Sequence, residues 1–223
     1  MARRRRVWWI VGSVVAVLAL GLGIGPLLYA ALQEDAAAAP TVQAQPSGVE
    51  LTADTDGTWT VAPGSSAGYR VDEVLNGADV TVAGTTDQVT GSVVIDGGDL
   101  ASADVSVDVG SIRTDSGQRD AYFRGNVMDV DTHPTGTFVV RGPVDLPELS
   151  GTPVTVPVSG DLTLRGTTRP VTADLSVVRT AEGVGVSGVV PVVFPDFGIT
   201  APDLGFVRVE DRGQVEFLLE LTM

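Results

Sequence analysis

The 223-residue sequence contains no cysteine and no lysine, and aromatic residues make up only 5% of it. The absence of cysteine excludes disulfide bonds, thiolate metal sites, a thiol nucleophile and N-terminal lipoprotein modification. All 14 basic residues are arginines, a bias to which we assign no mechanism. The length suffices for one domain with a substantial core, because a domain of this size buries about two thirds of the surface that its unfolded chain exposes.

The net charge of −14 is distributed unevenly. Four arginines stand at residues 3–6, whereas the chain after Leu32 carries 10 arginines against 28 acidic residues, a net charge of about −18. Nucleic-acid phosphates repel a domain of this charge. We therefore expect no nucleic-acid partner.

An uncharged, apolar segment covers residues 7–32. As a helix it would be about 39 Å long, which exceeds the roughly 30 Å hydrocarbon core of a bilayer. The arginines in the basic tip, residues 1–6, predict a cytoplasmic N-terminus. We expect a single-pass signal anchor that places the rest of the chain outside the cytoplasm. The alternative is a cleaved signal peptide, which would release a secreted domain.

Residues 33–57 are rich in Ala, Pro, Gln, Ser and Thr and show no apolar periodicity. Such a composition is typical of a flexible, partly extended linker. We expect this segment to tether the following domain, residues 58–223, to the membrane.

Apolar and polar residues alternate through most of the sequence after residue 58. The clearest runs are residues 103–109, 154–164, 171–177, 184–192 and 215–221, and weaker ones are 69–74, 79–83, 88–95, 137–141 and 206–209. This alternation predicts antiparallel strands with one buried face. Gly160 and Gly166 are expected at turns or bulges.

These strands predict an all-β domain, specifically an extended antiparallel β-barrel of about eight strands with a loop and short-helix insert. Long strands joined by short turns favour up-and-down closure over the alternative, a β-sandwich. A barrel of about eight strands has room for one small ligand. The inward positions are mostly Val, Leu and Ala, which suit either an apolar ligand or a solid packed core.

The polar segment 111–134 interrupts the strands and carries the candidate site residues with charge. Arg119 and Asp120 either contact a polar ligand head group at the cavity mouth or attach the insert to the barrel. His133, the single histidine, is expected to be an ordinary loop residue, because the sequence has no cysteine and no Gly-x-Ser-x-Gly nucleophile motif. No acidic turn follows the EF-hand pattern. We expect no catalytic residues, no metal and no cofactor.

Several short motifs occur in an order and spacing that resemble the YceI-like family of lipid-binding β-barrels, over residues 58–223. They are Thr58-Trp59-Thr60-Val61, Ser111-Ile112-Arg113-Thr114 with Arg119-Asp120, His133-Pro134 with Thr137-Phe138, the segment 160–171, Asp196-Phe197-Gly198-Ile199, and Val215-Glu216-Phe217. The sequence departs from the family pattern at Asn126-Val127-Met128, where Asp-Phe-Phe is usual, and at Tyr122, where a histidine is common.

The resemblance implies a lipocalin-like barrel whose apolar cavity holds a long isoprenoid or other lipid chain. The residues expected to contact it are Phe123, Met128, Phe138, Leu162, Leu164, Phe194, Phe197, Phe206 and Arg119. Core packing is the alternative for each of the large apolar side chains. For the whole chain, we expect a membrane-tethered, extracytoplasmic lipid carrier. The alternative is a solid-cored scaffold or adhesion module of the cell envelope. We leave open whether the protein forms a homodimer, because related barrels can pair.

Overall fold

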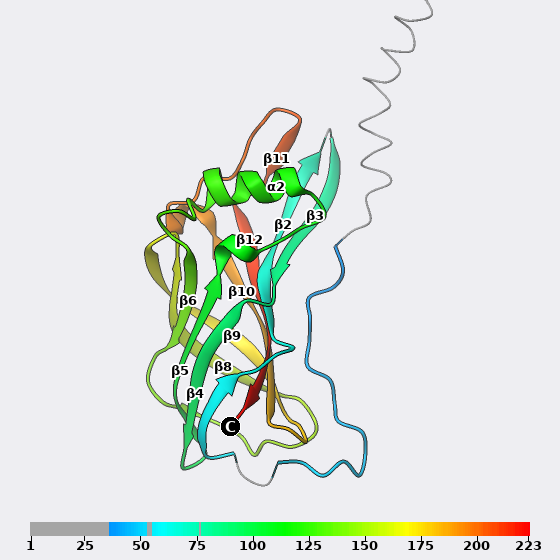
Figure 1. Ribbon diagram of the computed structural model, residues 1–223, viewed down its shortest axis with the longest axis vertical. Helices are drawn as coiled ribbons and strands as arrows, with labels where there is room; N and C mark the ends of the chain where they lie inside the picture. Colours follow the sequence, from blue (N-terminus) through cyan, green and yellow to red (C-terminus); the bar gives the residue numbers. More distant parts are fainter. Residues whose placement is uncertain (1–35, 53–54, 76) are drawn as a thin grey trace, which may run out of the picture.

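The computed structural model describes residues 36–52, 55–75 and 77–223 (Figure 1). The predicted basic tip, residues 1–6, and the predicted anchor, residues 7–32, lie outside these ranges. Within them, no helix combines the length and apolar character needed to cross a membrane. The described residues form an all-β domain with a few short helices, as the sequence predicted.

The sheet contains twelve strands, all paired antiparallel. They are β1 (Gly57–Val61), β2 (Ser66–Leu75), β3 (Ala78–Thr86), β4 (Val89–Asp96), β5 (Asp99–Asp108), β6 (Thr135–Val140), β7 (Val144–Asp145), β8 (Val154–Leu164), β9 (Thr167–Arg179), β10 (Val184–Val193), β11 (Val207–Val209) and β12 (Arg212–Thr222). The short helices are η1 (Val109–Ser111), α2 (Gly117–Tyr122), the π-helical η2 (Phe123–Val127) and η3 (Phe194–Phe197).

Eight of the described strands close a barrel in the order β1-β4-β5-β6-β8-β9-β10-β12. β1 completes the ring because it pairs with β4 on one edge and with the end of β12 on the other. Trp59 on β1 is buried in the core, and its indole N–H donates to the carbonyl of Thr55 at 2.8 Å. The prediction of a closed antiparallel barrel of about eight strands is confirmed.

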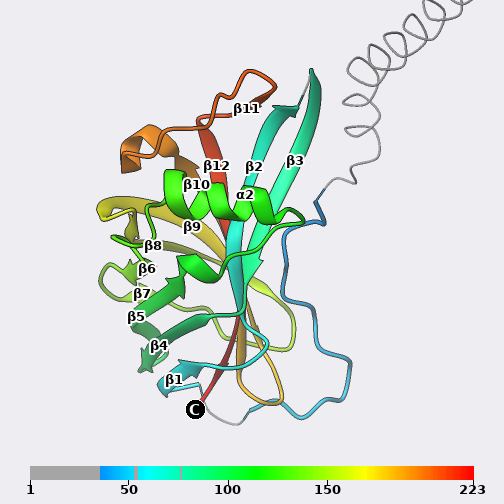
Figure 2. The same cartoon turned by 45° about the horizontal axis from the view of Figure 1, so that its top comes forward.

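The β2–β3 hairpin extends beyond this ring. β12 is longer than β1, so the first part of its edge pairs with β2, with Val215 opposite Tyr69. β11 pairs with the far end of β2, where Val207 lies opposite Leu75. The tip of this hairpin, α2 and η3 all lie at one end of the barrel, which we call the insert end (Figures 1 and 2). The C-terminus lies at the opposite end, which we call the β1 end.

The insert, residues 109–134, connects β5 to β6 in the chain and lies across the barrel (Figure 2). It is joined to β3 by reciprocal backbone hydrogen bonds between Thr85 and Arg113, both 2.9 Å. Its helix α2 begins after Ser116, whose hydroxyl accepts a hydrogen bond from the Arg119 N–H at 3.4 Å, a usual N-cap arrangement. The expected loop and short-helix insert is therefore present.

The hydrogen-bonded pairing between neighbouring barrel strands is less complete at the insert end than at the β1 end. The pairing of β9 with β10 runs from Arg179 opposite Val184 to Leu175 opposite Gly188, and both strands continue beyond it. At the β1 end, β1 bridges β4 and β12. The wall is thus closed by hydrogen bonds at the β1 end and covered by the insert at the other.

Part of the predicted flexible linker lies against the barrel. Residues 36–52, which we call the strap, run along its outer wall from β3 toward the β1 end (Figure 1). Backbone hydrogen bonds join both ends of the strap to the barrel, from Ala36 N to Thr81 O at 3.4 Å and from Thr52 N to Thr180 O at 3.0 Å. The strap therefore differs from the free tether that its composition predicts.

Candidate ligand-binding cavity

The barrel encloses a cavity of about 260 Å³. Its lining reaches from Phe123 and Pro202 at the insert end to Leu100, Leu149 and Val184 at the β1 end. The lining side chains are the inward-facing members of the alternating strands, such as Val190 and Val192 of β10 and Phe217, Leu219 and Leu221 of β12. Strand alternation thus produces a long, almost wholly apolar interior.

The structure places seven of the nine predicted ligand-contacting residues in the cavity lining. They are Phe123, Met128, Phe138, Leu162, Leu164, Phe194 and Arg119. Phe197 is buried in the hydrophobic core but does not line the cavity. Phe206 is 58% exposed in the loop before β11 and also lies outside the lining. Contact of the seven with a ligand stays a prediction.

Two glycines make room for the rings of Phe138 and His133. A Cβ atom at Gly160 would lie 2.4 Å from Phe138 Cζ, so the ring packs over the glycine. Gly160 lies within a continuous stretch of β8–β9 pairing, so the expectation of a turn or bulge there is wrong. Gly166 does occupy a turn, with a φ of +70°, and the His133 ring packs over it.

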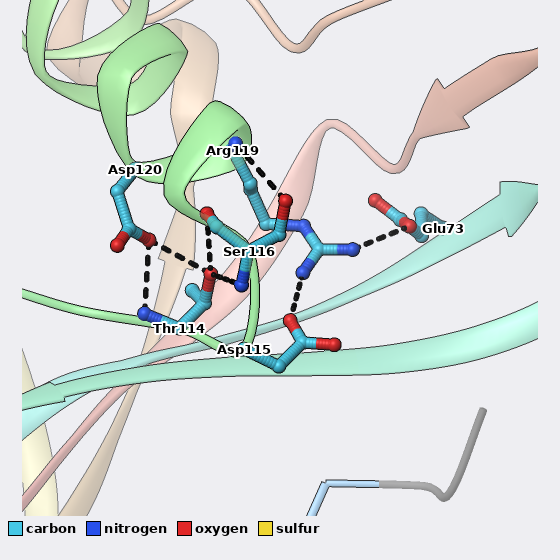
Figure 3. Close-up of polar contacts among 6 residues, drawn as sticks. All are labelled: Glu73, Thr114, Asp115, Ser116, Arg119 and Asp120. Carbon is cyan, nitrogen blue, oxygen red and sulfur yellow. Dashed lines mark hydrogen bonds and ion pairs between the residues drawn. The ribbon is translucent and has the colours of Figure 1, made fainter.

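Two charged side chains line the cavity among the described residues, Glu73 of β2 and Arg119 of α2. Glu73 is only 5% exposed, and its Oε1 lies 3.5 Å from Arg119 Nη2. Arg119 also forms an ion pair with Asp115, four residues earlier on the insert (Figure 3). The arginine is therefore shared between a buried carboxylate of the barrel and an exposed one of the insert.

Asp120, in contrast, stabilises the insert internally. Its buried carboxylate accepts hydrogen bonds from the Thr114 backbone N–H at 2.9 Å and from the Thr114 hydroxyl at 2.8 Å (Figure 3). The ion pair of Arg119 with Glu73 is the expected attachment of the insert to the barrel, whereas contact of Arg119 with a ligand head group stays a prediction. Asp120 attaches one part of the insert to another, whereas Arg119 both lines the cavity and pairs with β2.

Tyr69 lies next to this ion pair. Its ring stacks on Phe123 of the insert, with centroids 4.8 Å apart and planes 18° apart. Burial raises the pKa of the Tyr69 hydroxyl to about 12, although the nearby Arg119 acts in the opposite direction. The hydroxyl is therefore protonated at neutral pH and available to donate a hydrogen bond.

The residues that the sequence interpretation missed are Glu73 and Tyr69. Both belong to the inward phase of β2, together with Ala67 and Val71. Strand alternation across residues 69–74 carries this signal, but a glutamate at an inward position is easily read as the solvent face. In the described ranges no cluster of three or more His, Asp or Glu side chains is arranged to hold a metal ion.

The sequence profile of the YceI-like domain matches residues 59–221. A UPF0312 protein of Pseudomonas aeruginosa is 29% identical over 124 residues, which cover 52% of this chain and 59% of that protein. The match thus spans about six tenths of the length of this curated relative.

Two solved structures share the fold. Burkholderia cenocepacia BcnA has a TM-score of 0.60 at 23% identity, covering 73% of this chain and 99% of BcnA. A polyisoprenoid binding domain from Saccharophagus degradans, implicated in plant cell wall breakdown, has a TM-score of 0.60 at 20% identity, covering 74% and 97% of the two chains. At these identities the similarity establishes the fold alone.

Proposed function

Because this chain belongs to the YceI-like domain family, we propose that its barrel binds an isoprenoid or another long-chain lipid. The observation that carries the proposal is the elongated apolar cavity of about 260 Å³. The name of the structurally similar Saccharophagus degradans domain supports the same ligand class. The cavity argues against the alternative of a solid-cored scaffold.

Burial of a hydrocarbon chain supplies the affinity. Each buried methylene contributes about 0.8 kcal/mol, so a chain of roughly 15 carbons gains on the order of 10 kcal/mol before the costs of ordering and association. Such binding needs few polar contacts. Specificity then depends mainly on the length and width of the cavity.

The charges beside the cavity favour a neutral polar head group over a diphosphate. Arg119 already pairs with Glu73 and Asp115, so its positive charge is balanced by two carboxylates. A dianionic head group would be repelled by these carboxylates. A quinone carbonyl or a prenol hydroxyl could instead accept a hydrogen bond from the Tyr69 hydroxyl, which stays protonated.

We further propose that the protein is a carrier or sequestering protein tethered to the membrane outside the cytoplasm. The support comes from the sequence, namely the uncharged segment 7–32 behind a cluster of arginines. The residue inventory around the cavity offers no nucleophile and base pair, so we propose binding rather than catalysis.

Lipid extraction and probe binding test the proposal on the full chain. We expect organic extracts of the purified protein to contain a prenyl-chain lipid at up to one molecule per chain. After extraction, the protein should take up a fluorescent farnesyl probe saturably, and a menaquinone analogue should compete. An extract without lipid, combined with non-saturable uptake of the probe, would refute the proposal.

A further inference from the structure

Backbone N–H groups of the strap donate hydrogen bonds to four separate parts of the barrel. In chain order they are Ala36 N to Thr81 O at 3.4 Å, Val42 N to Ser187 Oγ at 3.1 Å, Gln45 N to Gly151 O at 2.7 Å and Thr52 N to Thr180 O at 3.0 Å. The first of these is on β3 near the insert end, and the last two are in loops at the β1 end (Figure 1). The strap therefore runs along the outside of the barrel from the insert end to the β1 end.

Three outward-facing residues beneath the strap are buried. Val178 of β9, Ser187 of β10 and Glu216 of β12 alternate with cavity-lining neighbours, yet each is at most 3% exposed. A Cβ atom at Gly185 would lie 3.2 Å from side-chain atoms of both Val42 and Val178, so both valines pack closely against this glycine. The outer wall is thus built to receive the strap.

Arg70 of β2 fastens the beginning of the strap. Its Nε and Nη2 donate to the two carboxylate oxygens of Glu216 at 2.9 and 3.2 Å. The same guanidinium donates to the backbone carbonyls of Ala36, at 3.4 Å, and Ala37. A planar guanidinium held by a carboxylate on two of its nitrogens is well oriented to bind such carbonyls.

The point at which the strap begins limits where a membrane anchor could lie. Only four peptide units separate Leu32, the end of the apolar segment, from Ala36, a span of at most about 14 Å. A free linker over residues 33–57 could extend about 80 Å and would allow any orientation of the barrel. Ala36 binds β3 three residues from the start of that strand at Ala78, about 10 Å along it.

The rim of the insert end carries exposed apolar side chains. Leu204 and Phe206, in the loop between η3 and β11, are 47% and 58% exposed. This loop lies at the same end as α2 and the tip of the β2–β3 hairpin (Figure 2). Exposed leucine and phenylalanine side chains at one rim are suited to the interfacial region of a bilayer.

We propose that the strap and the Arg70–Glu216 ion pair hold the insert end of the barrel against the membrane surface. The end of the barrel where β9 and β10 are no longer paired then faces the bilayer, and a lipid chain passes between bilayer and cavity beside the insert without crossing water. This inference rests on the proposed function, because it takes residues 7–32 as the membrane anchor. The partner surface is a phospholipid bilayer of low negative charge, since the domain is strongly acidic.

Fluorescence quenching in vesicles tests the orientation. Because the chain has no cysteine, Arg208→Cys at the rim and Met223→Cys at the β1 end each give one unique labelling site. The full chain carrying either change is labelled with bimane and reconstituted into phosphatidylcholine vesicles containing a nitroxide-headgroup lipid. We expect the label at position 208 to be quenched at least threefold more than the label at position 223.

Removal of the Arg70–Glu216 ion pair should abolish this difference in quenching. In Arg70→Gln, and in the Arg70→Gln/Glu216→Gln double variant that leaves no unpaired carboxylate, the ratio of the two quenching values should fall toward one. Arg212→Gln is the matched control, because Arg212 is an exposed arginine of β12 paired with Glu210. The control should keep the ratio of the unmodified chain.

The outcomes separate this inference from the proposed function. Equal quenching at both positions, or a ratio that the Arg70 and Glu216 variants do not change, would overturn the orientation even if the protein takes up the farnesyl probe. Failure of the chain to float with vesicles would overturn the anchor and the orientation together. A high quenching ratio without any probe uptake would support the orientation and refute lipid binding.

Discussion

Arg119 Nη2 of the insert lies 3.5 Å from Glu73 Oε1 of β2, and the two side chains line the same cavity. The pair joins an insert that follows β5 to a hairpin that precedes β4. It also places the charged groups of the lining next to the Tyr69–Phe123 stack. The same contact therefore bears on both the stability of the insert and the chemistry at that end of the cavity.

The first prediction concerns this ion pair. Arg119→Leu leaves the buried Glu73 without its partner, so we expect the free energy of unfolding to fall by about 1–3 kcal/mol, less than for a fully buried pair because Arg119 is 22% exposed. The double variant Arg119→Leu/Glu73→Leu should recover most of the loss, because it removes both charges. Urea denaturation of the unmodified chain, the two single variants Arg119→Leu and Glu73→Leu, and the double variant measures the loss and its recovery.

Arg212→Leu is the control for the loss of an arginine. Its pair with Glu210 is largely exposed, so we expect a change within about 0.5 kcal/mol. A double variant that is less stable than Arg119→Leu would contradict the prediction, because the loss would then come from packing and not from the unpaired carboxylate.

The second prediction concerns the cavity volume. Val140 and Val139 are neighbours on β6, but Val140 lines the cavity whereas Val139 points outward and is 40% exposed. Val140→Phe should reduce the affinity for a farnesyl probe at least tenfold, because the larger side chain occupies space that the ligand needs. Val139→Phe should leave the affinity unchanged. Equal affinities of the two variants in fluorescence titrations would show that the probe binds elsewhere.

Much of this architecture follows from the alternation of apolar and polar residues along the strands. The alternation in residues 184–192 and 215–221 predicts which side chains of β10 and β12 face inward, and the structure places them in the lining. What it cannot predict are contacts between distant segments. Arg70 and Glu216 are 146 residues apart, and the strap that covers them has the composition of a free linker.

The candidate site shows the same limit. Phe206 is a large apolar residue in a chain with few of them, which suggested a cavity role, but its place on a rim loop depends on how η3 and β11 are arranged in space. Glu73 differs from its expected environment in the opposite direction. A glutamate is ordinarily solvent-exposed, but Glu73 is buried here beside its ion-pair partner Arg119. Neither outcome is encoded in local pattern.

The third prediction concerns pH. The pKa of Tyr69 is about 12 in the folded protein and near 10 when unfolded. Between these values the unfolded chain loses a proton that the folded protein retains, so ionisation of Tyr69 favours unfolding. This contribution to stability is complete below pH 10 and decreases by about 2–3 kcal/mol as the pH rises through 12.

Urea midpoints measured from pH 9 to 12 test this dependence against Tyr69→Phe. The variant retains the stacking ring but cannot ionise, so the difference in stability between the two proteins should change across this range. The comparison cancels contributions from the other tyrosines. Parallel pH profiles for the two proteins would rule out a buried, late-titrating hydroxyl at position 69.

The last prediction concerns Gly160 of β8. A Cβ atom there would lie 2.4 Å from Phe138 Cζ and 2.7 Å from the carbonyl oxygen of Val139. The Phe138 ring could turn away, but the backbone oxygen belongs to the paired strand β6, so the ladder itself must shift. We expect Gly160→Ala to lower the free energy of unfolding by about 1–3 kcal/mol.

Gly117→Ala is the control, because a Cβ atom at the start of α2 meets nothing within 4 Å and alanine favours helix. If urea denaturation shows equal stability for the two variants, the close packing of Phe138 over Gly160 is wrong. A loss of stability confined to Gly160→Ala, together with weaker binding of the farnesyl probe, would instead show that the glycine keeps Phe138 in the position where it lines the cavity.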